Sequence, residues 1–227
     1  LYLEPGTAKL GKGSSITFGN TSTLTDQVIG INSSVPLKNI EVNSPNATTT
    51  VQMQIRDLTL EENLDIGASS EFEANGLDLN IEGDFTNAGT FIANGNTTTF
   101  NGTDDQTITG NTTFYNLVKT TTNKLGIEEA TTDSIYVDNN FRIEDGTFAD
   151  SSNAIMVRGN LFIDGTHIYG GTGNGIELDG TVEQEISGNG TLGTFTISNP
   201  YGAVVPQGNE ITIKDTLNLN GGILDVG

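Results

Sequence analysis

The chain of 227 residues carries 29 acidic and 9 basic side chains, a net charge of −20, and has no cysteine and no tryptophan. This charge excludes nucleic acids and anionic membranes as expected partners, and the lack of cysteine excludes disulfides and thiolate metal sites. No apolar run approaches about 18 residues, so the sequence predicts no membrane-spanning helix.

Taken in chain order, the first clear pattern is a short box that returns twice. An acidic residue, Gln, any residue and Ile follow one another from Asp26, from Asp105 and from Glu183. The isoleucines of successive boxes lie 108 − 29 = 79 and 186 − 108 = 78 residues apart. A fixed internal period of this kind indicates a repeat array instead of a compact enzyme. We predict one continuous domain, residues 1–227, with internal repeats at approximately 1–76, 77–152 and 153–227.

Short strands are predicted after each box. Residues 58–60, 135–137 and 211–213 each place two aliphatic side chains on one face and a third residue on the other, which is the period of a half-buried strand. Clusters of Gly, Asn, Asp and Thr separate such segments and mark turns. The residues expected to point into the core are Ile29, Ile108, Leu117, Ile135, Val137, Ile186, Phe195, Ile211 and Ile213.

This pattern predicts an all-β fold, a right-handed parallel β-solenoid (β-helix). Each repeat should hold roughly seven or eight strands in about three coils. The whole chain should then form a rod of about nine coils, roughly 45 Å long at about 4.8 Å per coil. A tandem β-sandwich stalk is the competing architecture, although the units are short for it and the chain has no core Trp.

The segment from Phe85 to Val118, FTNAGTFIANGNTTTFNGTDDQTITGNTTFYNLV, resembles the repeats of large cell-surface adhesins of the Bacteroidetes. The segment from Leu178 to Ile197 is a degenerate copy of it, and the resemblance extends over essentially the whole chain. It implies a β-solenoid module of a very long exported protein, delivered by type IX secretion and in some cases used in gliding motility. Because the chain begins and ends within a repeat, we expect a piece of a longer protein whose signal and anchor lie elsewhere.

Candidate catalytic residues are few. A polysaccharide-cleaving solenoid of the galacturonase type would offer paired Asp residues, a Gly-His-Gly sequence and an Arg-x-Lys sequence. Asp104 and Asp105 form the one Asp pair, His167 is the one histidine and lacks the flanking glycines, and Arg142 has no Lys two positions later. We therefore expect no catalytic residue and no enzyme activity.

Metal and cofactor sites are not predicted either. Asp104, Asp105, Asp179 and Glu183 offer carboxylates that suit Ca²⁺. A solvated acidic face that keeps the rod soluble is the favoured interpretation of these residues.

Two further sets of residues stand out. The recurring Gln27, Gln106 and Gln184 are expected to bond through their side-chain amides to turn backbone. The resemblance also implies candidate O-glycosylation sites at Ser134 and Thr216, each of which follows an Asp and precedes an aliphatic residue.

Together these patterns favour a non-catalytic structural or adhesive segment of a large exported bacterial surface protein or filament, extracellular at the cell surface. The alternative is a non-catalytic part of a carbohydrate-active β-helix enzyme. Expected partners are the rest of its own longer chain, a glycan or solid surface, or copies of itself, without nucleic acid and without membrane insertion. Added salt or Ca²⁺ should strengthen contacts between such like-charged rods, because screening weakens their repulsion.

Overall fold

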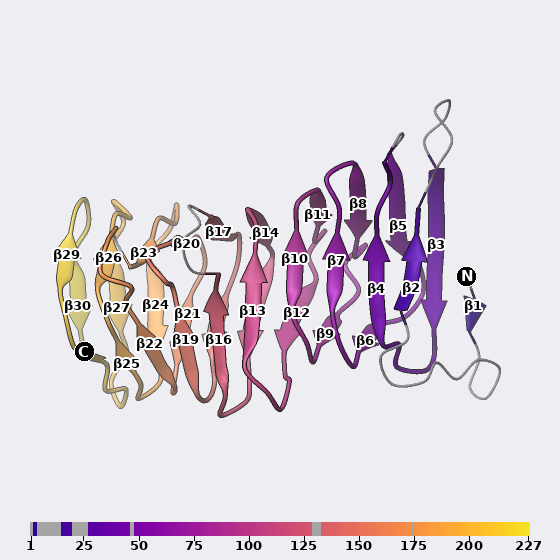
Figure 1. The fold of residues 1–227 in the computed structure, drawn as a ribbon. Helices are drawn as coiled ribbons and strands as arrows, with labels where there is room; N and C mark the ends of the chain where they lie inside the picture. The colour runs from indigo at the N-terminus through magenta and orange to yellow at the C-terminus, as the bar shows by residue number, and fades with distance from the viewer. Residues whose placement is uncertain (1, 4–14, 20–26, 46–47, 129–132, 174) are drawn as a thin grey trace.

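The computed structural model describes residues 2–3, 15–19, 27–45, 48–128, 133–173 and 175–227. Within this part of the chain all regular elements are β-strands, and they pair in parallel. The strands stack into an elongated body with the N-terminal and C-terminal coils at opposite ends (Figure 1).

The chain visits three long faces in turn, so that β4, β5 and β6 lie on faces 1, 2 and 3 and β7 returns to face 1. Face 1 is a ten-stranded sheet of β2 (Ser15–Phe18), β4 (Asn39–Val42), β7 (Leu64–Ile66), β10 (Phe85–Asn87), β13 (Gln106–Thr109), β16 (Lys124–Ile127), β19 (Thr147–Ala149), β22 (Thr166–Ile168), β25 (Thr191–Leu192) and β28 (Thr212–Ile213).

Face 2 is made of a five-stranded sheet followed by a six-stranded one. The first contains β1 (Tyr2–Leu3), β3 (Gln27–Ser33), β5 (Thr49–Met53), β8 (Ser70–Glu73) and β11 (Thr90–Ile92). The second contains β14 (Thr112–Phe114), β17 (Ser134–Val137), β20 (Ala154–Val157), β23 (Ile176–Leu178), β26 (Phe195–Ile197) and β29 (Leu217–Leu219).

Face 3 is a nine-stranded sheet of β6 (Leu58–Leu60), β9 (Leu79–Ile81), β12 (Thr97–Phe100), β15 (Asn116–Lys119), β18 (Phe141–Ile143), β21 (Leu161–Ile163), β24 (Gln184–Ser187), β27 (Ala203–Val205) and β30 (Leu224–Val226). From β4 to β30 the described residues hold 30 − 4 + 1 = 27 strands, which make nine coils of three. The predicted all-β parallel solenoid of about nine coils is confirmed, and the alternative of tandem β-sandwiches is wrong.

Strands are more numerous and shorter than the sequence pattern predicts. Residues 39–114, about one sequence repeat, hold the eleven strands β4 to β14 instead of seven or eight. Many of these strands have only three residues, such as Leu64–Ile66. A repeat therefore covers three and two-thirds coils, because each coil uses three strands.

As a result, matching residues of successive repeats lie on different faces. Gln27 belongs to β3 on face 2, Gln106 to β13 on face 1 and Gln184 to β24 on face 3. The step from β13 to β24 is eleven strands, and the step from β3 to β13 is ten strands plus the segment at Leu37, which bridges to Leu60 on face 3. Because eleven is not a multiple of three, each step moves the pattern back by one face.

The core consists of columns of inward side chains that run along the rod. On face 3, for example, Leu79, Thr98, Leu117 and Phe141 are in register on neighbouring strands, and all four are buried. Full burial of one Leu or Phe side chain stabilises the fold by about 1.5–3 kcal/mol. Six of the predicted core residues are buried, namely Ile108, Leu117, Ile135, Val137, Ile186 and Phe195. The other three, Ile29, Ile211 and Ile213, are partly buried and pack against this core.

Asparagine and aspartate side chains connect neighbouring coils at the corners. On face 3 the N–H of Asn140 donates to Asn116 Oδ1 at 3.2 Å, and the N–H of Asn160 donates to Asn140 Oδ1 at 3.0 Å. On face 1 the N–H of Asn63 donates to Asn39 Oδ1 at 2.7 Å. Each bond satisfies a backbone donor where the chain turns and the strand ladder is interrupted. Hydrogen bonds therefore connect neighbouring coils at the corners in addition to the strand pairing on the flat faces.

Candidate functional site

The candidate catalytic residues do not meet in space. Asp104 and Asp105 are exposed at the corner between β12 and β13, and Asp105 Oδ1 accepts a hydrogen bond from the backbone N–H of Lys124 at 2.9 Å. His167 lies in β22, three coils farther along face 1, and its side chain is buried. An acid pair and a histidine separated in this way cannot act on one substrate bond.

His167 instead forms a buried polar cluster with Asp150, which the sequence analysis did not identify. Its Nε2 lies 2.9 Å from Asp150 Oδ2, and its Nδ1 accepts a hydrogen bond from the backbone N–H of Gly193 at 3.3 Å. An accepting Nδ1 places the proton on Nε2, which donates to the carboxylate. Asp150 Oδ1 accepts from the backbone N–H groups of Gly170 at 2.7 Å and Ser152 at 2.9 Å. The cluster joins successive coils inside the rod and has no contact with solvent.

Arg142 lies on the outer side of face 3. Its guanidinium carbon is 4.2 Å from the centroid of the Phe162 ring, and its Nη2 is 2.9 Å from Glu144 Oε1. Arg142 and Phe162, together with Asn140 and Asn160, border a shallow groove of about 190 Å³. We call this the face 3 groove, and its lining also includes Phe141, Leu161, Glu185 and Ser187. It combines an aromatic surface, a cation and amide groups on a rigid sheet.

Acidic side chains gather at the corner between faces 3 and 1. A groove of about 490 Å³ there is lined by the carboxylates of Glu61, Glu62, Glu82, Asp84, Asp104 and Asp105, with Lys38 paired to Glu61. Two of these carboxylates, Asp84 and Asp105, already accept backbone hydrogen bonds from the next coil. In the described ranges of the chain, no group of three or more His, Asp or Glu side chains is placed to hold a metal ion.

The other two carboxylates considered for Ca²⁺ are several coils away. Asp179 follows β23 and Glu183 precedes β24. Burial raises the pKa of Asp179, and Arg158, whose Nε lies 4.0 Å from Asp179 Oδ2, opposes that increase. The exposed Glu183 lies outside this pair. The four acids therefore do not form one site.

The glutamine of the repeated box acts as a corner staple. The side-chain Oε1 of Gln106 accepts a hydrogen bond from the backbone N–H of Gly102 at 2.9 Å. Its Nε2 donates to the carbonyl of Ile81 at 3.0 Å and to the carbonyl of Gly83, both in the preceding coil. The predicted bonding of this amide to turn backbone is confirmed. The side chain of Gln27 lies outside the described residues.

The same contacts recur in the third box on another face. Gln184 Oε1 accepts from the N–H of Gly180 at 2.9 Å, and its Nε2 donates to the carbonyl of Val157 at 3.0 Å and to the carbonyl of Gly159. The donor glycine precedes each glutamine by four residues, and in both boxes the first acceptor is the last residue of a strand of the preceding coil, although β13 and β24 belong to faces 1 and 3. The box therefore forms the same hydrogen-bonded corner whether the strand that follows the corner lies on face 1 or on face 3.

The two candidate glycosylation sites differ in exposure. Ser134 begins β17, is half-buried, and donates its backbone N–H to Asn111 Oδ1 at 2.8 Å. Thr216 is exposed before β29, and its backbone carbonyl accepts from the N–H of Phe195 at 2.8 Å. Of the two hydroxyls, that of Thr216 is the more accessible to a modifying enzyme. Both sites stay predictions.

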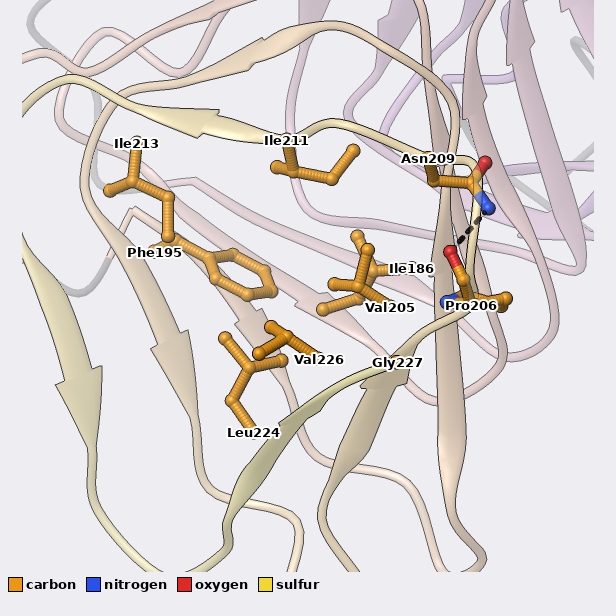
Figure 2. Close-up of a pocket in the computed structure, with 10 residues that line it drawn as sticks. All are labelled: Ile186, Phe195, Val205, Pro206, Asn209, Ile211, Ile213, Leu224, Val226 and Gly227. Carbon is orange, nitrogen blue, oxygen red and sulfur yellow. Dashed lines mark hydrogen bonds between the residues drawn. The ribbon is translucent and has the colours of Figure 1, made fainter.

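The C-terminal end of the rod forms an apolar pocket of about 160 Å³ (Figure 2). Side chains of β26, β28 and β30 face one another across it, among them Phe195, Ile213 and Val226. At the rim, Asn209 Nδ2 donates to the carbonyl of Pro206 at 2.9 Å. The pocket continues the apolar core between the last described strands of the three faces.

Comparison of the chain with family models, with curated proteins and with solved structures finds no match. Among the residues that the structure describes, no helix has the length and apolar character needed to cross a membrane. The similarity of Phe85–Val118 to bacterial adhesin repeats is therefore supported by the sequence pattern alone, and what it implies stays a proposal.

Proposed function

We propose that this protein is a non-catalytic structural and adhesive segment of a large exported bacterial surface protein or filament. The observation that carries the proposal is the continuity of the stack. Parallel pairing runs from β4 to β28 on face 1 and from β6 to β30 on face 3. On face 2 it runs from β5 to β29 with one break, between β11 and β14, where the two strands are still in contact. A body built of coils that contact only their neighbours is a spacer, whose length grows with the number of coils.

The interior polar groups support a structural role. The buried His167, Asp150, Gln106 and Gln184 bond to backbone or to one another and connect one coil to the next. A catalytic group needs access to substrate and a partner at hydrogen-bond distance from the reacting atom. These four side chains serve instead to satisfy buried backbone groups, which would otherwise destabilise the rod.

The face 3 groove is the surface that best suits an adhesive contact. Phe162 offers an aromatic ring to the apolar side of a sugar, and Asn140 and Asn160 offer amide N–H donors to hydroxyl groups. Arg142 beside Glu144 adds polar contacts with little net charge. We propose that this groove binds a glycan weakly and repeatedly, as an adhesive rod requires.

Export and location follow from the adhesin resemblance. An acidic, cysteine-free rod is soluble and independent of redox conditions. We place it outside the cell, at the bacterial surface, delivered by type IX secretion and serving adhesion or gliding motility. The Asp-Ser-Ile and Asp-Thr-Leu sequences at Ser134 and Thr216 are the proposed O-glycosylation sites.

A polysaccharide panel tests the two halves of this proposal. The purified chain should release no new reducing ends from neutral or acidic glycans, yet it should be retarded on a column that carries the glycan it binds. Phe162→Ala should abolish the retardation. Tyr136→Ala is the matched control, because Arg158 lies 5.8 Å from that ring on face 2 in a similar stacked pair.

Two outcomes would contradict the proposal. Glycan cleavage that disappears in the Asp104→Asn, Asp105→Asn double variant would favour the carbohydrate-active enzyme. Equal retardation of the wild type and Phe162→Ala would exclude the face 3 groove as the adhesive surface.

A further inference from the structure

The middle positions of the face 3 strands form a row of side chains on the outer side of the sheet. These positions are in register from β9 to β24 and hold Asn80, Thr99, Val118, Arg142, Phe162 and Ser187. We call them the central row. The row contains no carboxylate, although the chain as a whole has a net charge of −20. Its last three residues line the face 3 groove, so the groove is one part of a longer surface.

One flank of the central row consists of asparagine side chains at the starts of the strands. Asn140 Oδ1 accepts the backbone N–H of Asn160 at 3.0 Å, and Asn160 Oδ1 accepts that of Glu185 at 2.9 Å. Because each oxygen is bonded to the next coil, the amide is held in one orientation and its Nδ2 group remains a donor. Both amides line the face 3 groove. This flank therefore offers N–H groups to an acceptor such as a hydroxyl oxygen.

The other flank, at the ends of the same strands, is acidic. The residue after each strand donates its backbone N–H to the coil before it, which places Glu82, Glu144 and Asp164 in one line with Asn101 and Thr120. The three carboxylates are exposed. A carboxylate accepts strong hydrogen bonds from hydroxyl groups and repels another anion. This flank therefore suits a ligand that is rich in hydroxyl groups and carries no negative charge.

The central row and its flanks run parallel to the axis of the rod, because they follow the stacking of the coils. Register partners on adjacent strands lie about 4.8 Å apart, so the five steps from Asn80 to Ser187 span about 24 Å. A step of this size is close to the length of one sugar unit in an extended chain. Each coil can therefore present one set of contacts to one sugar.

We infer that the ligand of face 3 is a linear, uncharged polysaccharide that lies along the rod axis, over the central row. One sugar places its apolar side on the Phe162 ring, while hydroxyl groups accept from the amide flank and donate to the acidic flank. A polyanionic glycan in this position would run beside the carboxylates and be repelled. The inference rests on the proposed glycan binding by the face 3 groove, and it names the class and the direction of that glycan.

Oligosaccharides of graded length test the inference. The probes are end-labelled cello-, manno-, xylo- and laminari-oligosaccharides from the disaccharide to the hexasaccharide, with oligogalacturonates of the same lengths as the anionic arm, and fluorescence anisotropy measures the dissociation constant. In a neutral series the affinity should rise with each added sugar and level off at about five or six units, when the central row is covered. The oligogalacturonates should not bind.

Variants separate the row from the groove. Thr99→Ala should lower the affinity for the hexasaccharide by about threefold to tenfold, the effect of one lost hydrogen bond, and leave the disaccharide unchanged, because Phe162 lies three coils away. Phe162→Ala should weaken binding at every length. Thr113→Ala is the matched control, since Thr113 is also an outward threonine in the middle of a strand, β14 on face 2.

Three results would overturn the inference: binding of no neutral series, an affinity that does not change with length, or equal effects of Thr99→Ala and Thr113→Ala on the hexasaccharide. If Phe162→Ala still abolishes retardation on a polysaccharide column in any of these cases, the groove binds glycan as proposed and only the class or direction of the ligand is wrong. The failure of the inference is therefore distinguishable from the failure of the proposed function.

Discussion

Replacing Gln106 with alanine should destabilise the rod by removing a complete corner staple. The side chain satisfies the N–H of Gly102 and two carbonyl groups of the preceding coil, those of Ile81 and Gly83. The Ile81 carbonyl also accepts from the N–H of Asn101 at 3.1 Å, so it keeps one partner in the variant. The loss therefore falls mainly on the Gly102 N–H and the Gly83 carbonyl.

At about 1–3 kcal/mol for the buried N–H of Gly102 and about 1 kcal/mol for the part-buried carbonyl of Gly83, the change should lower the free energy of unfolding by about 2–4 kcal/mol. Gln184→Ala should cost the same amount. It leaves the N–H of Gly180 and the carbonyl of Gly159 without a partner, while the Val157 carbonyl keeps the N–H of Asp179 at 3.1 Å. Asn199 Nδ2, which also donates to Gln184 Oε1 at 3.0 Å, keeps its bond to the carbonyl of Val182. The expectation of equal effects is the sharper claim, because β13 and β24 lie on different faces.

Urea unfolding followed by far-ultraviolet circular dichroism measures both variants. With a denaturant slope of about 2–3 kcal/mol per molar, the midpoint should fall by about 1 M. Gln54→Ala, at an exposed glutamine, is the control and should stay within about 0.5 kcal/mol of the wild type. The glutamine bonds do not stabilise the corner as proposed if Gln106→Ala unfolds like the control. The same conclusion holds if the free energies of unfolding of the two box variants differ by more than about 2 kcal/mol.

Three further predictions concern buried or partly buried groups. Burial is the largest cause that raises the pKa of Asp65 above 3.8, and Glu41 one coil away adds to it. This stabilising contribution is therefore present below the unfolded pKa and is lost as the pH rises through the folded pKa. Asp65→Asn should thus be more stable than the wild type at neutral pH, with the difference vanishing in acid in pH-dependent urea titrations. Burial lowers the pKa of Lys119 from 10.5, so the unfolded chain binds this proton where the folded chain has released it. Stability should therefore rise with pH up to about 10.5 in the wild type, and Lys119→Met should remove that part of the slope. Ile108→Asp places a charge at a fully buried position and should lower the free energy of unfolding by several kcal/mol, so a thermal melting temperature equal to the wild type would show that the strand register is wrong.

The solenoid and most of its core were predictable because they depend on local patterns. Alternation in segments such as 58–60 and 135–137 fixes which side chains face inward. The glycines that end the boxes were also readable as turns: Gly110 and Gly188 have φ of 93° and 105°, and a Cβ at either position would lie about 2 Å from a carbonyl oxygen of the preceding coil. Here the sequence constrains the backbone directly.

The number of strands and the interior polar contacts were harder to predict. A strand such as Thr147–Ala149 buries one apolar side chain, so it shows no alternation that a sequence pattern would detect. The pairing of Asp150 with His167 depends on two residues that meet only through the coil register. The asparagine bonds did leave a signal, an Asn or Asp directly before an apolar-x-apolar triplet, as at Asn63 and Asn160. That signal is recognisable once the length of a coil is known.

Because eleven strands do not make a whole number of three-strand coils, successive repeats are rotated relative to one another about the axis of the rod. Each copy of the repeat is shifted by one face relative to the copy before it. The box at Gln27 therefore lies on face 2, the box at Gln106 on face 1 and the box at Gln184 on face 3. A given motif would return to the same side only after thirty-three strands, or eleven coils, about 53 Å along the axis at about 4.8 Å per coil. Matching residues of successive repeats therefore lie on different faces, and a partner that approaches from any direction meets the same motifs in a different order.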